Sequence, residues 1–323
     1  RALELAGLKP PSIEDDDASR LRPSDRVITA AYRILRKHFA RLLWHDPGAR
    51  LGFDPERLHD MRVAARRILA ALRLFRDALP QRRVETLRRE FRWLAGELGR
   101  VRDLDVSIAR LEAEARDMGP DVEKAVAPYR DSMARDRERA RRRMLRSLSS
   151  RRYEALITRA ERWLKLGPPR RPAAALARRP VSDAAPKMIR NGLRRTLKTG
   201  RALTPQTPDD TLHAYRRQLK RARYLCEFFA DLYGEQAVEV ARRIAEAQDT
   251  LGARQDALVA NQSLQRFATL RPVPRGAPAR LHLCLGQLME RRRVLAAGLH
   301  DQFFAIFRRL DRKKTLAPLL RRL

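Results

Sequence analysis

Hydrophobic residues recur every three to four positions along most of the chain, which is the spacing of an amphipathic α-helix. No stretch shows the sustained alternation of apolar and polar residues that a half-buried β-strand requires. The pattern predicts helices at 23–46, 55–79, 81–117, 120–148, 150–166, 181–203, 208–232, 234–269 and 279–310. We therefore expect an all-α fold.

The main interruption of this pattern is the proline-rich stretch 167–186. Proline lacks a backbone N–H and clashes with the preceding turn, so a dense group of prolines ends any helix. The sequence therefore divides into two helical halves. We predict a leader or linker at 1–21, a first bundle at 22–166, a Pro-rich linker at 167–180, a second bundle at 181–312 and a basic C-terminal tail at 313–323.

Two sequence motifs occur once in each half. "LHDMRVAARR" begins at Leu58 and "LHAYRRQLKR" begins at Leu212, an offset of 154 residues. "LGRVRDLDV" at 98–106 resembles "LGARQDALV" at 251–259, an offset of 153. A nearly constant offset across two separate motifs indicates duplication of a whole unit, which we expect to form a bundle of about four helices.

Each histidine motif places its basic residues on the side of its helix opposite the apolar residues. Like charges stacked on successive turns destabilise a helix by roughly 0.2–0.5 kcal/mol per pair, which a bound anion could offset. A basic run is more often a solvated face, and a repeated interface between bundles stays an alternative. Repetition at one offset favours a functional surface. The two stripes comprise His59, Arg62, Arg66 and Arg73 in the first half and His213, Arg216, Lys220 and Arg223 in the second.

The charge balance points to a polyanionic partner. The 323 residues include 71 Lys and Arg against 39 Asp and Glu, which gives a net charge of +32. Nucleic acid, acidic lipid and inorganic polyphosphate are the partner classes that fit this excess. No apolar run is long enough to span a membrane. Cys226 and Cys284 are too few for a disulfide framework or a zinc site, which fits a reducing cytoplasm.

The sequence contains no recognisable catalytic apparatus. It has no phosphate-binding loop of the glycine–lysine–serine type, no nucleophile elbow and no cluster of His and Asp with metal-ligand spacing. We therefore expect no catalytic residues, no metal and no cofactor. Asp103 and Asp256 are isolated acids in the second motif. We interpret them as groups that orient arginines or histidines of neighbouring helices, not as a metal-binding pair.

The two histidine helices and the "LGRVRDLDV" motif resemble those of the CHAD family, which is named for a conserved histidine in an α-helical domain. The resemblance covers roughly residues 22–312. It implies two four-helix bundles related by a pseudo-two-fold, with a basic channel between them that binds inorganic polyphosphate without chemistry. CHAD domains often follow a CYTH triphosphatase domain, and "RALELAGLKPPS" at the start is expected to be the tail and linker of such a domain.

The resemblance and the stripes together give the candidate polyphosphate-binding residues. One departure from the family pattern is Leu69, where a basic residue is usual and the second copy has Arg223. The first helix of each half also has a basic side that could extend the surface. The candidates are His59, Arg62, Arg66, Arg67, Arg73, His213, Arg216, Arg217, Lys220, Arg221 and Arg223, with Arg33, Lys37, Arg194 and Lys198 on the first helices.

The low aromatic content separates the candidate partners. Binders of single-stranded nucleic acid stack bases on aromatic rings, and only 6% of this chain is aromatic. Polyphosphate needs only a track of Arg and Lys. The leading prediction is a non-catalytic polyphosphate-binding module in the cytoplasm, associated with polyphosphate granules. Non-specific binding of nucleic acid and an accessory role beside a CYTH-type triphosphatase are the alternatives.

Overall fold

The computed structural model describes residues 20–270 and 280–323, apart from the side chains of Leu270, Lys313 and Lys314. Within these residues the fold is built from helices, and the only strand-like pairing is an isolated bridge between Arg26 and Pro180. The prediction of an all-α fold is confirmed. The leader predicted at 1–21 lies almost entirely outside the described residues.

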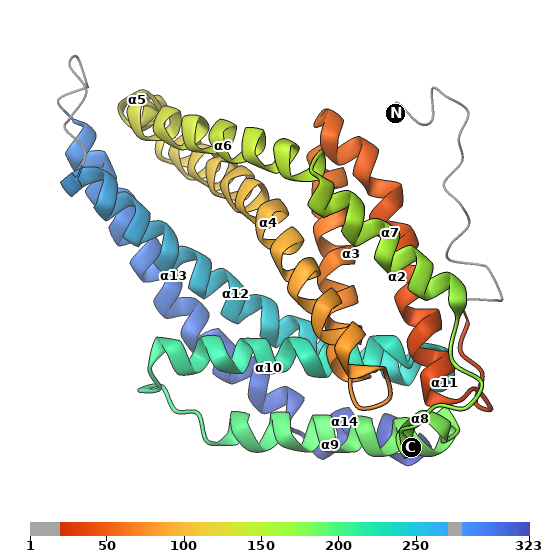
Figure 1. Cartoon of the computed structure of the whole chain (residues 1–323). Helices are drawn as coiled ribbons and strands as arrows, with labels where there is room; N and C mark the ends of the chain where they lie inside the picture. Colours follow the sequence, from red (N-terminus) through yellow and green to blue (C-terminus); the bar gives the residue numbers. More distant parts are fainter. Residues whose placement is uncertain (1–19, 271–279) are drawn as a thin grey trace.

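The first half is a bundle in which the fourth helix is broken in two. Helix α6 runs back along α4 and α7 continues its course beside α2, as Figure 1 shows. Ser150 separates the two pieces, and its side chain accepts a hydrogen bond from the backbone N–H of Tyr153 to cap α7. The helices are α2 (Val27–Leu51), α3 (Pro55–Leu74), α4 (Gln81–Met118), α5 (Pro120–Ala125), α6 (Ala127–Leu148) and α7 (Arg151–Leu166).

Two helix boundaries near prolines differ from the prediction. Helix α2 does not end at residue 46 but continues through Pro47 to Leu51, and the Gly52 that follows it has a φ of 74°. Glycine adopts this left-handed conformation without strain, and its N–H donates to the Gly48 carbonyl to close the last turn. The helix predicted at 120–148 is instead two helices. The break falls at Val126, and Pro128 lies in the first turn of α6, where a missing N–H is tolerated.

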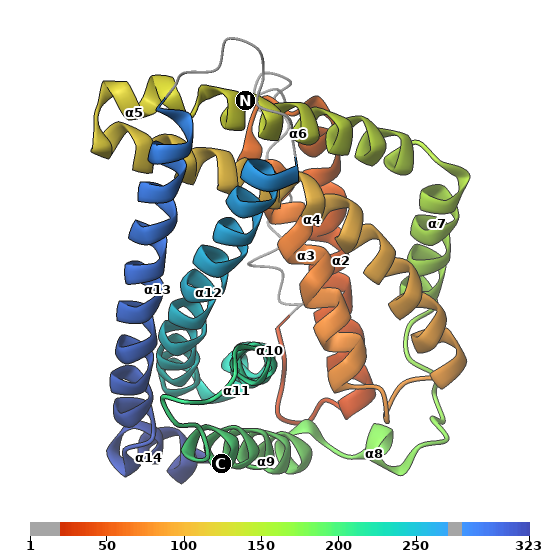
Figure 2. The same cartoon turned by 90° about the vertical axis from the view of Figure 1, so that its left-hand side faces the viewer.

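The second half has the same order of long helices. Figure 2 shows α12 and α13 lying side by side along most of their length. The helices are α8 (Ala175–Arg178), α9 (Val181–Arg201), α10 (Asp209–Phe228), α11 (Ala230–Tyr233), α12 (Glu235–Leu270), α13 (Leu281–Leu310) and α14 (Lys313–Arg322). The basic tail predicted at 313–323 is instead the helix α14. Its Leu316 and Leu319, three residues apart, are both buried in the main core.

The proline-rich connection is packed against the start of α2. The backbone N–H of Val27 donates to the Arg179 carbonyl at 2.9 Å, and the N–H of Val181 donates to the Asp25 carbonyl at 2.7 Å. Ala177 of the short helix α8 is fully buried. These contacts hold the starts of α2 and α9 together, so the predicted linker is an ordered joint between the halves.

The main hydrophobic core runs through both halves. Helices α3 and α10 each have 20 residues, and 154 residues separate both their starts and their ends. Phe75 and Phe229 follow these two helices and pack edge to face, with ring centroids 6.0 Å apart and both side chains fully buried. The halves are therefore joined at the ends of α3 and α10.

The halves meet again at the far ends of their long helices. A second cluster of buried apolar residues joins α4, α5 and α6 to α12 and α13. The Tyr129 hydroxyl donates to Ser263 Oγ at 2.9 Å, and Arg292 pairs with Glu114 at 2.7 Å across the same contact. We call this contact the tip. Helices α4 and α12 are thus fixed at both ends. One end lies at the tip, and the other lies at the junction beside α3 and α10.

Candidate anion-binding site

Helices α3 and α10 are oriented by their apolar faces. In α3, Met61, Ala65 and Ile68 are buried, and in α10 Tyr215 and Leu219 are buried. Both helices carry acidic residues in the first turn, which complements the positive end of the helix dipole. Because each apolar face is buried in the shared core, the basic stripe of each helix is left on the opposite side.

The two stripes come together in one group of cations. Burial and the neighbouring charges of Arg66, Arg216, Arg223 and Arg62 lower the pKa of Lys220 to about 6. The pKa of Arg66 is likewise lowered by burial and by the charges of Arg62 and Arg216. These influences cross from α3 to α10, so the stripes face each other. We call the group the central cluster: Arg62, Arg66, Arg216, Lys220 and Arg223.

Much of the positive charge of the central cluster is not balanced by an acid. Asp103 accepts a hydrogen bond from Arg62 at 3.0 Å, and Glu227 pairs with Arg223 at 3.2 Å. Within the part of the chain that the structure describes, no carboxylate forms an ion pair with Arg66, Arg216 or Lys220. Since guanidinium groups do not lose their proton in proteins, the cluster remains strongly positive.

Two glycines of the second motif leave room for the arginines to lie against the neighbouring helix. A Cβ added to Gly99 of α4 lies 3.4 Å from Arg62 Nε, and one added to Gly252 of α12 lies 2.9 Å from Arg216 Nη2. The arginine of each histidine motif therefore lies directly on the backbone of the long helix in its own half. A side chain at position 252 would therefore have to displace the end of Arg216, whereas one at position 99 would only touch Arg62. The glycines of the repeated "LG" thus allow these arginines to approach the long helices closely.

The two isolated acids take different partners. Asp103 holds Arg62 within the first half, as the sequence analysis predicted. Asp256 of α12 lies 3.8 Å from Arg110 of α4, in the other half. Burial raises the pKa of Asp256, and the nearby charge of Asp103 adds to this effect, while Arg110 and Arg216 oppose it. Both acids therefore lie beside the central cluster, between α4 and α12.

Tyr224 is a member of the site that the sequence analysis missed. Its ring lies beneath three cations, with the charged groups of Arg67, Lys220 and Arg223 5.7, 5.6 and 5.2 Å from the ring centre. The ring is buried and stacks on Phe228. The signal that could have found it is its position four residues after Lys220, on the same helix face.

The two histidines are partly buried beside the stripes. The Nδ1 atoms of His59 and His213 are both buried, and neither has a hydrogen-bond partner among the described residues. The pKa of His213 is lowered by burial and then by the charges of Arg217 and Arg216. His213 is therefore neutral at neutral pH in the free protein, and a nearby anion would favour its protonated form.

Two of the predicted residues, Arg73 of α3 and Arg221 of α10, lie away from the central cluster. Arg73 and Arg221 line a cavity of about 530 Å³ between α3, α9 and α10, together with Arg195. The pKa of Arg221 is lowered by burial and by the charges of Arg73 and Arg217. The predicted surface is therefore two basic areas, and Arg195 is a further member that the sequence analysis did not include.

The basic residues of the first helices mostly lie elsewhere, which corrects the prediction that they extend the stripes. Arg33 pairs with Asp25 at 3.4 Å, near the start of α2. Arg194 lines a hollow beside α14, and Lys198 is exposed on α9. Lys37 lies next to His38, whose pKa is lowered by burial and by Arg67.

Sites of two other kinds are not found in the described part of the chain. Within the described residues, no group of three or more His, Cys, Asp or Glu could hold a metal ion. None of the helices in these same parts of the chain is both long and apolar enough to cross a membrane. Cys226 and Cys284 are buried free thiols.

Comparison with solved structures shows the same fold. The CHAD domain from the plant Ricinus communis matches with a TM-score of 0.72 and 25% identity, covering 90% of this chain and 94% of that chain. PptA from Streptomyces chartreusis matches with a TM-score of 0.70 and 23% identity, covering 88% of this chain and 100% of that chain. Both likenesses extend over nearly the whole of this chain.

Comparison with sequences gives the family. Two curated proteins of Mycobacterium tuberculosis, the uncharacterized proteins MT2285 and Rv2226, are 25% identical over 294 residues, or 90% of this chain and 54% of theirs. The chain thus spans about half the length of these relatives. The family model of the CHAD domain matches residues 33–265, from α2 into α12. By this match over most of its length, the chain belongs to the CHAD family.

Proposed function

We propose that this protein binds inorganic polyphosphate in the central cluster and performs no chemistry on it. The observation that carries the proposal is the meeting of Arg66, Arg216 and Lys220, basic side chains of two helices that have no ion-pair partner in the described residues. An extended anion lying between α3 and α10 would offset their mutual repulsion. Polyphosphate binding is also what membership of the CHAD family implies.

The chemistry of the cluster favours a phosphate chain over nucleic acid. Arginine grips phosphate through two parallel hydrogen bonds, and the cluster offers arginines from both helices. The nearby ring of Tyr224 is covered by cations and only 6% exposed, so it offers no surface on which a base could stack. A flexible chain with a charge on every phosphate and no bases fits these features.

The experiment is a titration with long-chain polyphosphate, competed by single-stranded DNA of equal total charge at physiological salt. Polyphosphate should bind more tightly, and both affinities should fall as salt rises. Equal or tighter binding of DNA at matched salt would contradict the proposal and favour a nucleic-acid-binding protein. As a corollary, the protein is proposed to act in the cytoplasm on polyphosphate granules.

A further inference from the structure

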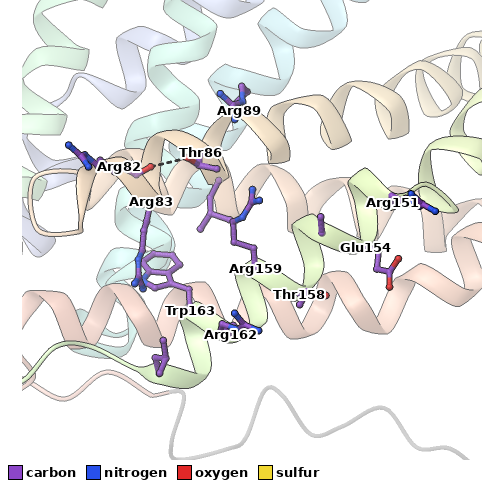
Figure 3. Close-up of a pocket in the computed structure, with 13 residues that line it drawn as sticks. Arg82, Arg83, Thr86, Arg89, Arg151, Glu154, Thr158, Arg159, Arg162 and Trp163 are labelled. Atoms are coloured by element: carbon purple, nitrogen blue, oxygen red, sulfur yellow. Dashed lines mark hydrogen bonds between the residues drawn. The ribbon is translucent and has the colours of Figure 1, made fainter.

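A second basic surface lies on the outside of the first half, in a groove between the start of α4 and helix α7. The groove has a volume of about 970 Å³. Figure 3 shows its arginines projecting from both helices. We call it the outer groove, and every residue that lines it belongs to α4 or α7. Its arginines are Arg82, Arg83 and Arg89 of α4 with Arg151, Arg159 and Arg162 of α7.

Few acids are available to these arginines. Glu154 is the only acidic residue that lines the groove. Nearby Glu90 is shared between Arg89 at 3.0 Å and Arg152 at 2.7 Å. Across the described parts of the chain, the other arginines of the groove (82, 83, 151, 159 and 162) form no ion pair with a carboxylate. The outer groove thus shares with the central cluster an excess of positive charge that nothing in the structure neutralises.

The walls of the outer groove are held in place by the core. Trp163 at its floor is buried, and its ring centroid lies 5.0 Å from that of Tyr32 in α2. Arg36 of α2 donates from both Nε and Nη2 to the Leu164 carbonyl, at 3.0 and 2.6 Å. The last turn of α7 is therefore fixed to α2. The arginines project from a preformed surface, so binding an anion there needs no rearrangement of the helices.

We propose that the outer groove is a second phosphate-binding site, which takes a short phosphate chain or a segment of a long one. The inference rests on the proposed function only for the class of ligand. Arginines on two facing walls can grip successive phosphates, and the Thr158 hydroxyl lies among them. The one aromatic residue of the lining, Trp163, is buried and offers no stacking surface for a base. No residue of α3 or α10 lines the groove, so it is separate from the central cluster.

The test is calorimetric titration of the whole chain with tripolyphosphate, with Arg83→Glu/Arg159→Glu as the groove variant. Arg62→Glu/Arg66→Glu is the variant of the central cluster. The unmodified protein should bind two equivalents of tripolyphosphate, and each of these two variants should bind one. The matched control is Arg135→Glu/Arg142→Glu, which removes the same charge from two exposed positions of α6 outside the groove. It should keep both equivalents, and circular dichroism should show equal helicity throughout.

The outcomes separate this inference from the proposed function. If the groove variant keeps the stoichiometry of the unmodified protein, the outer groove is not a site, and the central cluster is unaffected. If the groove variant loses one equivalent but the central variant loses none, the groove stands and the proposed function is wrong. Arg83→Lys/Arg159→Lys should retain the second equivalent with weaker affinity, because lysine keeps the charge but not the paired hydrogen bonds. The same titration with long-chain polyphosphate tells whether one molecule occupies both sites. In that case one polyphosphate molecule is bound per protein chain.

Discussion

Phe75 and Phe229, 154 residues apart and equivalent in the two halves, pack edge to face with ring centroids 6.0 Å apart. Each follows the last turn of its basic helix and is fully buried. The pair therefore fixes how the ends of α3 and α10 meet. The distance between the two basic stripes depends on this contact.

Phe75→Ala should destabilise the protein by about 3–5 kcal/mol, because it removes a fully buried ring and leaves a cavity where the halves join. The free energy of unfolding from urea denaturation measures this. Phe53→Ala is the matched control, since Phe53 is 87% exposed, and should change stability by less than about 0.5 kcal/mol. A loss of under about 1 kcal/mol for Phe75→Ala contradicts a tightly packed junction.

Lys220 should take up a proton when an anion binds. Its pKa of about 6 leaves the amine mostly neutral at pH 7.5, because burial and the charges of Arg66, Arg216 and Arg223 disfavour the ammonium form. A bound phosphate chain favours that form and raises the pKa. Affinity should therefore fall as pH rises above about 6. Calorimetric titration in buffers of different ionisation enthalpy measures the proton uptake, which should be smaller in Lys220→Met; equal uptake in both proteins contradicts the assignment.

The same residue has an opposite effect on stability. Lys220 has its pKa lowered from 10.5 to about 6 in the folded protein, so between these values the unfolded chain binds more protons than the folded one. Lys220 therefore destabilises the folded protein less as pH rises through this interval. Lys220→Met should raise the melting temperature at pH 7, and the gain should shrink toward pH 10. A lower melting temperature for the variant at pH 7 would show that the Lys220 amine does not destabilise the folded protein.

The buried ion pair at the tip should contribute far more to stability than the exposed pair between Glu290 and Arg293. Arg292 is 3% exposed and pairs with Glu114 at 2.7 Å, so Glu114→Gln leaves a buried charge without a partner. The expected loss of stability is about 3–5 kcal/mol. The control is Glu290→Gln, whose partner Arg293 is 70% exposed, with an expected loss of at most about 1 kcal/mol. Hydrogen exchange should speed up at α5 and at the start of α13 only in Glu114→Gln, and equal protection in both variants contradicts this account.

The protein should not hydrolyse phosphate chains. Within the described residues no acidic or histidine cluster could hold a metal, and the central cluster has no nucleophile aligned with a base. Tripolyphosphate and ATP should therefore remain intact with or without magnesium, as measured by release of inorganic phosphate. Metal-dependent release that a single substitution in this chain abolishes would overturn the proposal of a non-catalytic binder.

The sequence was informative where the relevant contacts lie within one helix. Arg62, Arg66, Arg216 and Lys220 share helix faces with a fixed period, and that period alone predicts a basic stripe opposite an apolar one. The meeting of the stripes could be expected only from repetition and resemblance. It depends on the crossing of α3 and α10, which the Phe75–Phe229 contact sets and which no periodic pattern encodes.

What the sequence could not supply depends on contacts between distant elements. In the outer groove, Arg83 and Arg159 lie on two different helices. These helices are neighbours only because of the fold of the whole first half. Arg194 has the same spacing and charge as a site residue, but the rotation of α9 turns it toward α14. The helix α14 is short and basic at both ends, and the burial of its Leu316 and Leu319 in the main core depends on elements far from it in the chain.

The central claim is that one anion contacts both stripes. It is tested by a double-mutant cycle on polyphosphate affinity, combining Arg62→Glu/Arg66→Glu with Arg216→Glu/Lys220→Glu. Arg83→Glu/Arg159→Glu serves as the background, so that the outer groove does not contribute. Each pair should weaken binding by about tenfold or more with unchanged helicity, because all four positions lie off the apolar faces.

The two pairs should be strongly coupled, because neighbouring contacts to one ligand are rarely additive. The deciding quantity is the number of polyphosphate molecules bound per chain in each single pair. The account predicts that each pair loses most of the affinity of one common site. If each pair instead halves the stoichiometry while the remaining site keeps full affinity, the stripes are independent sites and the account is wrong.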